Sequence, residues 1–293
     1  MNYNAVLLKY QQPKYQLHWA LSLNNETANR FGNSYPTDKM KTLNFIYFQT
    51  SGGEKLSLSA IALGSGYTAR DSSEVIYMRG SYGVNLAYRS NRQDIGAAAY
   101  YQNGRNRSGQ QVSAYLLSLD WRYRTDPINF GGGAVCLSGQ DAANRGSEYQ
   151  KRDHLFDIIY GARHRYYGLM DYFSNLPAGT GKGGLIDFYS TLELPLSRIR
   201  HQLALHVFHL HSRVQNAAAA PILDSYLDSY LGSELDYSFT AVISDDLKLQ
   251  GGYSVMMPSV SLDQIQGLSA GESEYSHWGW LMLTCNVTLF KNK

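Results

Sequence analysis

Polar and apolar residues alternate along several segments of this chain that are longer than ordinary strands. In residues 14–24, apolar side chains occupy every second position from Tyr15 to Leu23. The same period of two recurs in residues 111–124, 231–243 and 277–290. An alternation of this kind gives a strand one apolar and one polar face. Because the segments run for about 10–15 residues, whereas strands of globular proteins usually have about 3–10, we expect long strands with two unlike faces.

The connections between these strands alternate in length. Short polar turns fall at residues 11–13, 51–54, 90–92, 125–127, 196–198 and 244–246. Longer connections fall between them, at residues 25–40, 68–73, 103–109, 139–179, 215–229 and 259–276. Short turns at one end of the strands and long loops at the other are typical of a transmembrane β-barrel. The sequence therefore predicts an all-β, antiparallel up-and-down transmembrane β-barrel of about 13–14 strands, in a single domain over residues 1–293.

The composition excludes several other classes of protein. No run of about 18 apolar residues occurs, so the sequence predicts no membrane-spanning helix. With 26 Lys and Arg residues against 24 Asp and Glu, the net charge of +2 argues against nucleic acid as a partner. Only 17% of the residues are charged and 24 are Tyr, whereas an ordinary soluble domain has about 25% charged residues. Low charge and abundant Tyr agree with strands that face lipid.

The first residues and the strand count both bear on the completeness of the barrel. The segment from Met1 to Tyr10 lacks the about 7–15 consecutive apolar residues of a secretory signal. An odd number of strands places the two ends of the chain on opposite sides of the membrane, whereas single-chain bacterial barrels normally have an even number. Together these features predict an N-terminally truncated barrel, a fragment of a longer precursor that supplies further strands.

The periodicity assigns side chains to the two faces of the wall. We expect eight apolar side chains to point outward toward lipid: Leu17, Trp19, Leu117, Leu119, Leu235, Phe239, Leu283 and Val287. Basic residues fall on the polar, inward face at Lys9, Arg122 and Arg124. Acidic residues share that face at Asp120, Asp187, Glu193, Glu234 and Asp236. Such a wall is either a ladder of ion pairs that braces the barrel or a surface that selects anions, since rings of Arg or Lys select anions in pores.

The longest connection carries a motif. It contains Phe156-Asp157, Tyr160-Gly161, His164, Tyr167-Gly168 and the run Met-Asp-Tyr-Phe at residues 170–173. At this spacing the motif resembles that of the alginate-export family of outer-membrane barrels, particularly its Bacteroidetes-type members. Residues 231–236 and 249–254 resemble the penultimate hairpin of that family, and the last strand ends at an aromatic residue, Phe290.

The resemblance implies a fold, a location and a function. The fold is a monomeric outer-membrane barrel of about eighteen strands, with outer-membrane lipid and the barrel-assembly machinery as partners. The function is passive export of an anionic polysaccharide such as alginate, or transport of small anionic solutes. Because guanidinium groups suit the carboxylates of uronate polymers, the resemblance favours anion preference over a purely bracing ladder.

Arg163, His164 and Arg165 lie inside the motif and have two interpretations. In one, they contact a saccharide, with cations for its carboxylates and the neighbouring aromatic rings for its sugar faces. In the other, the segment is a folded loop in which Asp157 and Asp171 pair with the two arginines. The predicted pore lining consists of these three residues with Lys9, Arg122, Arg124, Glu234 and Asp236.

Other chemistries find little support in the sequence. Four histidines cluster at His201, His206, His209 and His211, but no convincing third ligand for a metal joins any pair of them. No motif brings a Ser and a His beside an orienting group, as hydrolysis requires. We therefore expect no cofactor, no metal site and no enzyme. The competing hypotheses are a soluble carbohydrate-binding β-sandwich and a hydrolase built on a barrel.

Overall fold

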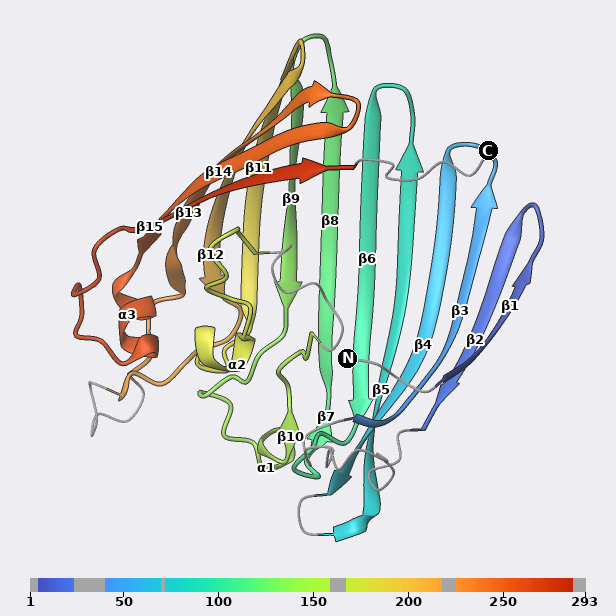
Figure 1. The fold of residues 1–293 in the computed structure, drawn as a ribbon. Coiled ribbons are helices and arrows are strands. Elements are labelled where there is room, and N and C mark those ends of the chain that lie inside the picture. Colours follow the sequence, from blue (N-terminus) through green and yellow to red (C-terminus); the bar gives the residue numbers. More distant parts are fainter. Residues whose placement is uncertain (1–4, 24–39, 70–71, 159–166, 218–224, 287–293) are drawn as a thin grey trace, which may run out of the picture.

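The computed structural model describes residues 5–23, 40–69, 72–158, 167–217 and 225–286, most of which belong to one sheet (Figure 1). Thirteen strands follow one another across this sheet in chain order, and each is antiparallel to its neighbours. They are β1 (Ala5–Gln11), β2 (Tyr15–Ser22), β3 (Met40–Gly52), β4 (Leu56–Ala69), β5 (Ser72–Arg89), β6 (Gln93–Gly104), β8 (Ala114–Arg124), β9 (Asn129–Leu137), β11 (Leu185–Leu196), β12 (Ile199–Leu210), β13 (Tyr230–Ser244), β14 (Leu247–Pro258) and β15 (Ser276–Cys285).

The remaining elements are small and lie in the long connections. Two short parallel strands pair there, β7 (Gln111–Val112) and β10 (Arg152–Asp153). The described residues also form three helices there: α1 (Ser147–Gln150), α2 (Leu176–Gly179) and α3 (Val260–Gln266). No helix in the described part of the chain is long and apolar enough to cross a membrane.

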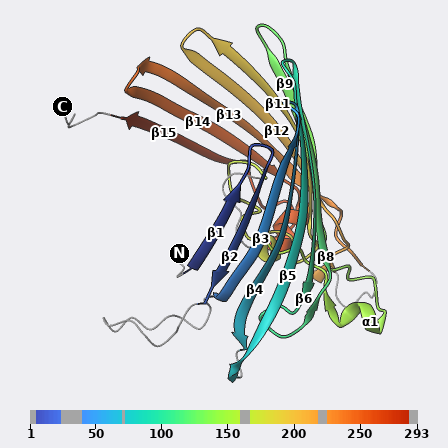
Figure 2. The ribbon, with the colours of Figure 1, turned by 90° about the vertical axis from the view of Figure 1, so that its right-hand side faces the viewer.

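The large sheet curves into an open trough, with β1 at one free edge and β15 at the other (Figure 1 and Figure 2). This arrangement confirms the predicted all-β, up-and-down antiparallel wall. A β-sandwich would require a second large sheet packed face to face on the first. The described residues form only the 13-stranded sheet and the two-stranded β7–β10 pair, so the sandwich hypothesis is wrong for this part of the chain.

Short and long connections alternate along the sheet as predicted, with the tight turns at one end of the strands and α1, α2 and α3 at the other (Figure 1). The predicted long connection at residues 68–73 is wrong. β4 continues to Ala69 and β5 begins at Ser72, because Val75, Ile76 and Tyr77 are strong strand formers that extend the ladder. The β4–β5 hairpin therefore projects beyond the other strands at the end with the long connections (Figure 1).

The outward face of the sheet carries exposed apolar side chains. Leu119 is 56% exposed and Leu283 is 63% exposed, and four more of the predicted outward residues are exposed: Leu17, Trp19, Leu117 and Leu235. Phe239 is half-buried and not exposed, because its ring lies against Gly251, its cross-strand partner. Val287 lies outside the described residues. The outward assignment is thus confirmed for the six exposed residues.

The buried apolar core lies inside the trough, where the long connections fold back onto the inner face. Phe208 of β12 and Met256 of β14 are fully buried, as are Phe173 and Leu262 from the connections. The rings of Phe173 and Phe208 are 4.6 Å apart between centroids. Burial of this kind stabilises the connections against the wall, so the trough is partly filled at that end.

Candidate functional site

The inner face of the trough borders a cavity of about 1230 Å³. Inward side chains of β3–β6, β8, β9 and β11–β13 line it, together with residues 156–158 and 167–169 of the longest connection. We call residues 156–173 the inserted segment; its residues 159–166 lie outside the described part. Because both described ends of this segment line the cavity, the longest connection narrows the space that the sheet curves around.

Two side chains of the wall hold the start of the inserted segment. Arg79 on β5 forms an ion pair with the Asp157 carboxylate through Nη1. Gln102 on β6 donates from Nε2 to the Asp157 carbonyl at 2.9 Å, and its Oε1 accepts the Asp157 N–H at 3.0 Å. The Arg79 side chain is only 7% exposed and Gln102 is fully buried. Each would therefore lose a necessary partner if the segment left the wall.

Glu234 on β13 holds the segment after its undescribed residues. Its Oε1 accepts the N–H of Leu169 at 2.6 Å and that of Met170 at 2.9 Å. Gly168 permits this approach, because its φ of +83° suits glycine and a Cβ there would lie 2.6 Å from the Glu234 carboxylate. The inserted segment is thus fixed to β5 and β6 at one end and to β13 at the other.

A cluster of ionisable side chains lies on the inner wall beside Glu234. His206 on β12 places Nδ1 2.9 Å from Asp187 Oδ2 on β11. Its Nε2 lies 4.0 Å from Asp236 Oδ2 on β13. The rings of Tyr189 and Phe208 stack with the imidazole at 5.6 Å between centroids. Asp187, His206 and Asp236 all line the cavity, so this cluster places two carboxylates and an imidazole on one side of it.

The structure separates the predicted pore-lining residues. Arg122 and Asp236 line the cavity, whereas Glu234 anchors the inserted segment. Within the described residues Arg122 has no ion-pair partner. Lys9 is exposed on β1, opposite His18 and away from the cavity. The predicted residues Arg163, His164 and Arg165 lie outside the described part.

Arg124 has a bracing role near the short turns. It forms an ion pair with Asp94 of the neighbouring strand and donates to the Ser90 carbonyl at 2.8 Å. Glu193 and Arg200, also near the short turns, approach to 3.2 Å. These pairs agree with the ladder interpretation for this end of the wall, in which Arg124 is paired with Asp94.

Sequence reasoning missed Arg79 and Gln102. The period of two places both on the polar face of their strands, which is the only signal that the sequence carries for them. Their partner, Asp157, is 78 residues from Arg79 and 55 from Gln102. The folded-loop hypothesis paired Asp157 with the arginines of its own segment, whereas the structure gives it Arg79.

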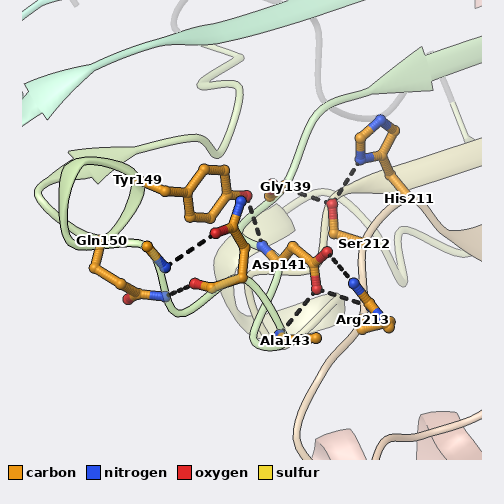
Figure 3. Close-up of polar contacts among 10 residues, drawn as sticks. Gly139, Asp141, Ala143, Tyr149, Gln150, His211, Ser212 and Arg213 are labelled. Carbon is orange, nitrogen blue, oxygen red and sulfur yellow. Dashed lines mark hydrogen bonds and ion pairs between the residues drawn. The ribbon is translucent and has the colours of Figure 1, made fainter.

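A second polar network lies where the long connections meet (Figure 3). Arg213 binds the Asp141 carboxylate with two groups, Nε at 3.1 Å and Nη2 at 2.9 Å. This hydrogen bonding lowers the pKa of Asp141 from its ordinary value. The Tyr149 hydroxyl accepts the Asp141 N–H at 2.9 Å. The network ties residues 139–150 to the β12–β13 connection.

Ser212 and His211 belong to the same network and bear on the hydrolase hypothesis (Figure 3). His211 Nδ1 lies 2.8 Å from Ser212 Oγ, but the Ser212 hydroxyl donates to the Gly139 carbonyl at 3.1 Å. His211 Nε2 contacts the Tyr115 hydroxyl at 2.7 Å in place of an orienting carboxylate. This geometry ties the long connections together and engages the Ser212 hydroxyl with a backbone carbonyl. No group of three or more His, Cys, Asp or Glu side chains that could hold a metal occurs in the described residues.

Comparison with known proteins identifies the fold. No protein-family model matches the chain, and no curated protein sequence matches it. Among solved structures, the outer membrane protein OprD from Pseudomonas aeruginosa aligns with a TM-score of 0.55 and 13% identity, over 95% of this chain and 67% of that one. OccAB4 from Acinetobacter baumannii aligns with a TM-score of 0.56 and 10% identity, over 96% of this chain and 64% of that one.

OccK11 from Pseudomonas aeruginosa gives a similar result, with a TM-score of 0.54 and 10% identity over 96% of this chain and 69% of that one. The chain therefore spans about two thirds of the length of these proteins. At these identities the likeness concerns the fold alone. The fold is that of an outer-membrane β-barrel, in agreement with the sequence prediction.

Proposed function

We propose that this chain forms the wall of a passive pore for small solutes in the bacterial outer membrane. The observation that carries the proposal is the pair of unlike faces on one curved sheet. The outer face exposes large apolar side chains such as Leu119 and Leu283. The inner face borders a cavity that the inserted segment narrows. Apolar residues outward and a lined space inward are the arrangement that a barrel needs in order to cross lipid and admit solutes.

The fixed inserted segment supports a pore of defined width. Arg79, Gln102 and Glu234 hold its described ends from three strands, so these ends remain in the cavity without a bound partner. A segment held in this way limits the size of solute that passes.

Conductance measurements test the proposal directly. The protein is refolded from detergent into planar lipid bilayers in 1 M KCl, and currents are recorded at fixed voltage. Stepwise conductance is expected, and Glu234→Ala is expected to raise the size of each step because the segment loses an anchor. Protein that folds in vesicles, as judged by circular dichroism, but never conducts would overturn the proposed function.

The charge of the cargo is a hypothesis separate from the pore itself. The sequence predicts anion preference and, through the family resemblance, an anionic polysaccharide such as alginate. Arg122 supports this hypothesis, because it lines the cavity without an ion-pair partner in the described residues. The other support lies in Arg163 and Arg165, which remain predictions. Reversal potentials in a KCl gradient, measured before and after Arg122→Gln, decide whether the pore prefers anions and whether Arg122 contributes to that preference.

The surroundings of the pore follow from the same fold. Outer-membrane lipid covers the apolar outer face, and the barrel-assembly machinery inserts the wall. We expect the protein to function as a monomer without a cofactor. Fractionation of the cell membranes tests the location. Size-exclusion chromatography of the detergent-solubilised protein tests the oligomeric state.

A further inference from the structure

The cavity has two chemically different sides. On one side, Leu43 and Phe45 of β3 and Ile61 and Leu63 of β4 line it and are only partly buried. Interiors of transmembrane barrels are polar as a rule. Four apolar side chains on the inner face of two neighbouring strands therefore call for a physical reason, and an apolar solute surface against them provides one.

Acidic groups dominate the other side of the same cavity. Asp120, Asp187 and Asp236 line it, against Arg122 and His206. Asp157 also lines the cavity, but Arg79 neutralises it. Among the described residues this side therefore carries an excess of negative charge, and such an excess on the wall of a narrow space raises the local concentration of cations.

Asp236 supplies a specific contact for such a cation. The residue is 4% exposed, and its Oδ1 is buried without a hydrogen-bond partner in the described residues. Its Oδ2 lies 4.0 Å from His206 Nε2, beyond hydrogen-bond distance. Glu234, the next inward residue on β13, is a second buried acid. Neighbouring carboxylates disfavour each other's charge, so a cation that approaches Asp236 from the cavity gains from the contact.

We propose that the cavity binds amphipathic organic cations, with the ammonium group toward Asp236 and the apolar body against the β3–β4 side. This inference rests on the proposed function, since it names the class of solute that the pore takes. It opposes the anion preference that the sequence predicts. An anionic solute would meet the carboxylates of Asp120, Asp187 and Asp236.

Three small probes separate charge from apolar surface. Phenethylammonium carries both a cation and an apolar body, ethylammonium carries the cation with little apolar surface, and phenylacetate carries the apolar body with the opposite charge. Binding to the folded protein in zwitterionic micelles is measured by titration calorimetry, with empty micelles as the blank. Phenethylammonium is expected to bind at least about tenfold more tightly than either of the others, because its ring buries apolar surface and its ammonium meets Asp236. Equal or tighter binding of phenylacetate would overturn the proposal.

Two variants assign the halves of the site. Asp236→Asn keeps the shape of the side chain and is expected to weaken both ammonium probes by about tenfold, a change that corresponds to about 1.4 kcal/mol. Ile61→Thr keeps the branched shape and is expected to weaken phenethylammonium alone. Glu193→Gln is the matched control, because Glu193 is an inward acid outside the cavity. If Asp236→Asn binds phenethylammonium as tightly as the parent protein, the assignment of the ammonium site is wrong; the probe comparison on the parent protein does not depend on how the variants fold.

Conductance separates this inference from the proposed function. Selective binding of phenethylammonium to a protein that never conducts supports the site and refutes the pore. Stepwise conductance without selective binding supports the pore and refutes the site.

Discussion

Removal of the Glu234 carboxylate gives a quantitative test of how the inserted segment is held. In Glu234→Ala, the N–H groups of Leu169 and Met170 lose their shared acceptor, which now lies at 2.6 and 2.9 Å. Leu169 and Met170 are half-buried, so the lower end of the cost of about 1–3 kcal/mol for each unsatisfied donor applies, and the attachment weakens by at least about 2 kcal/mol. Since a factor of ten corresponds to about 1.4 kcal/mol, the two amides are expected to exchange at least about 30-fold faster.

Hydrogen exchange followed by mass spectrometry, on protein refolded in lipid vesicles, measures this effect. Peptides that cover residues 167–173 are expected to lose protection, whereas peptides of β4 and β5 keep theirs. Glu234→Gln retains an acceptor oxygen of the same reach and is expected to lose only about 1 kcal/mol, or about fivefold. Glu193→Ala is the control, because Glu193 pairs with Arg200 near the short turns. Unchanged exchange at residues 167–173 in Glu234→Ala would refute the anchoring role.

Three further perturbations test other parts of the structure. Leu119→Arg places a charge on the lipid-facing side of β8 and is expected to cost about 2–4 kcal/mol in a folding titration in lipid vesicles; Ser118→Arg, on the inward side of the same strand, is the control, and equal losses would contradict the face assignment. Gly168→Ala is expected to destabilise the segment by about 1–3 kcal/mol, because the left-handed backbone is strained for alanine and its Cβ would lie 2.6 Å from Glu234; the same exchange assay measures it. Burial lowers the pKa of His211 from its ordinary value of 6.5, and Arg213 lowers that of Asp141 from 3.8. Both groups therefore stabilise the network around Asp141 and Arg213 when the pH is above their ordinary pKa values. We expect residues 139–150 to lose protection from exchange first as the pH falls below 6.5, and again as it falls below 3.8. Asp141→Asn is expected to remove only the second loss, as measured by exchange corrected for its intrinsic pH dependence.

The wall of the barrel could be predicted from the sequence because its signals are local. A period of two fixes which side chains of β8 share a face, and polar turns mark where strands end, so Leu117, Leu119 and Arg122 were assigned to the correct faces. The signal weakened where both faces are apolar. Around residues 43–48 and 61–63 apolar residues occur on both faces, and the alternation did not reveal the apolar inner side formed by Phe45 and Ile61.

The contacts inside the trough could not be predicted because they join distant parts of the chain. Glu234 was recognised as an inward acid, but its role depends on the N–H groups of Leu169 and Met170, 65 and 64 residues away. Asp157 was recognised within a motif, but its partner Arg79 lies on β5, 78 residues away, and no sequence pattern links the two. Local periodicity assigns a side chain to a face, whereas its partner on that face depends on how far the sheet curves and how the longest connection folds back.

The odd number of strands in the trough has a directional consequence. In an antiparallel series of thirteen strands, the first and the last run the same way, so β1 and β15 share one polarity. A seam that joined these two edges directly would have to be parallel, with the slanted and slightly weaker ladder of parallel pairs. A cylinder that kept every contact antiparallel would have to place an odd number of strands between the two edges. The direction in which β1 and β15 run, and not only the distance between these two edges, therefore decides which β structure can bridge them.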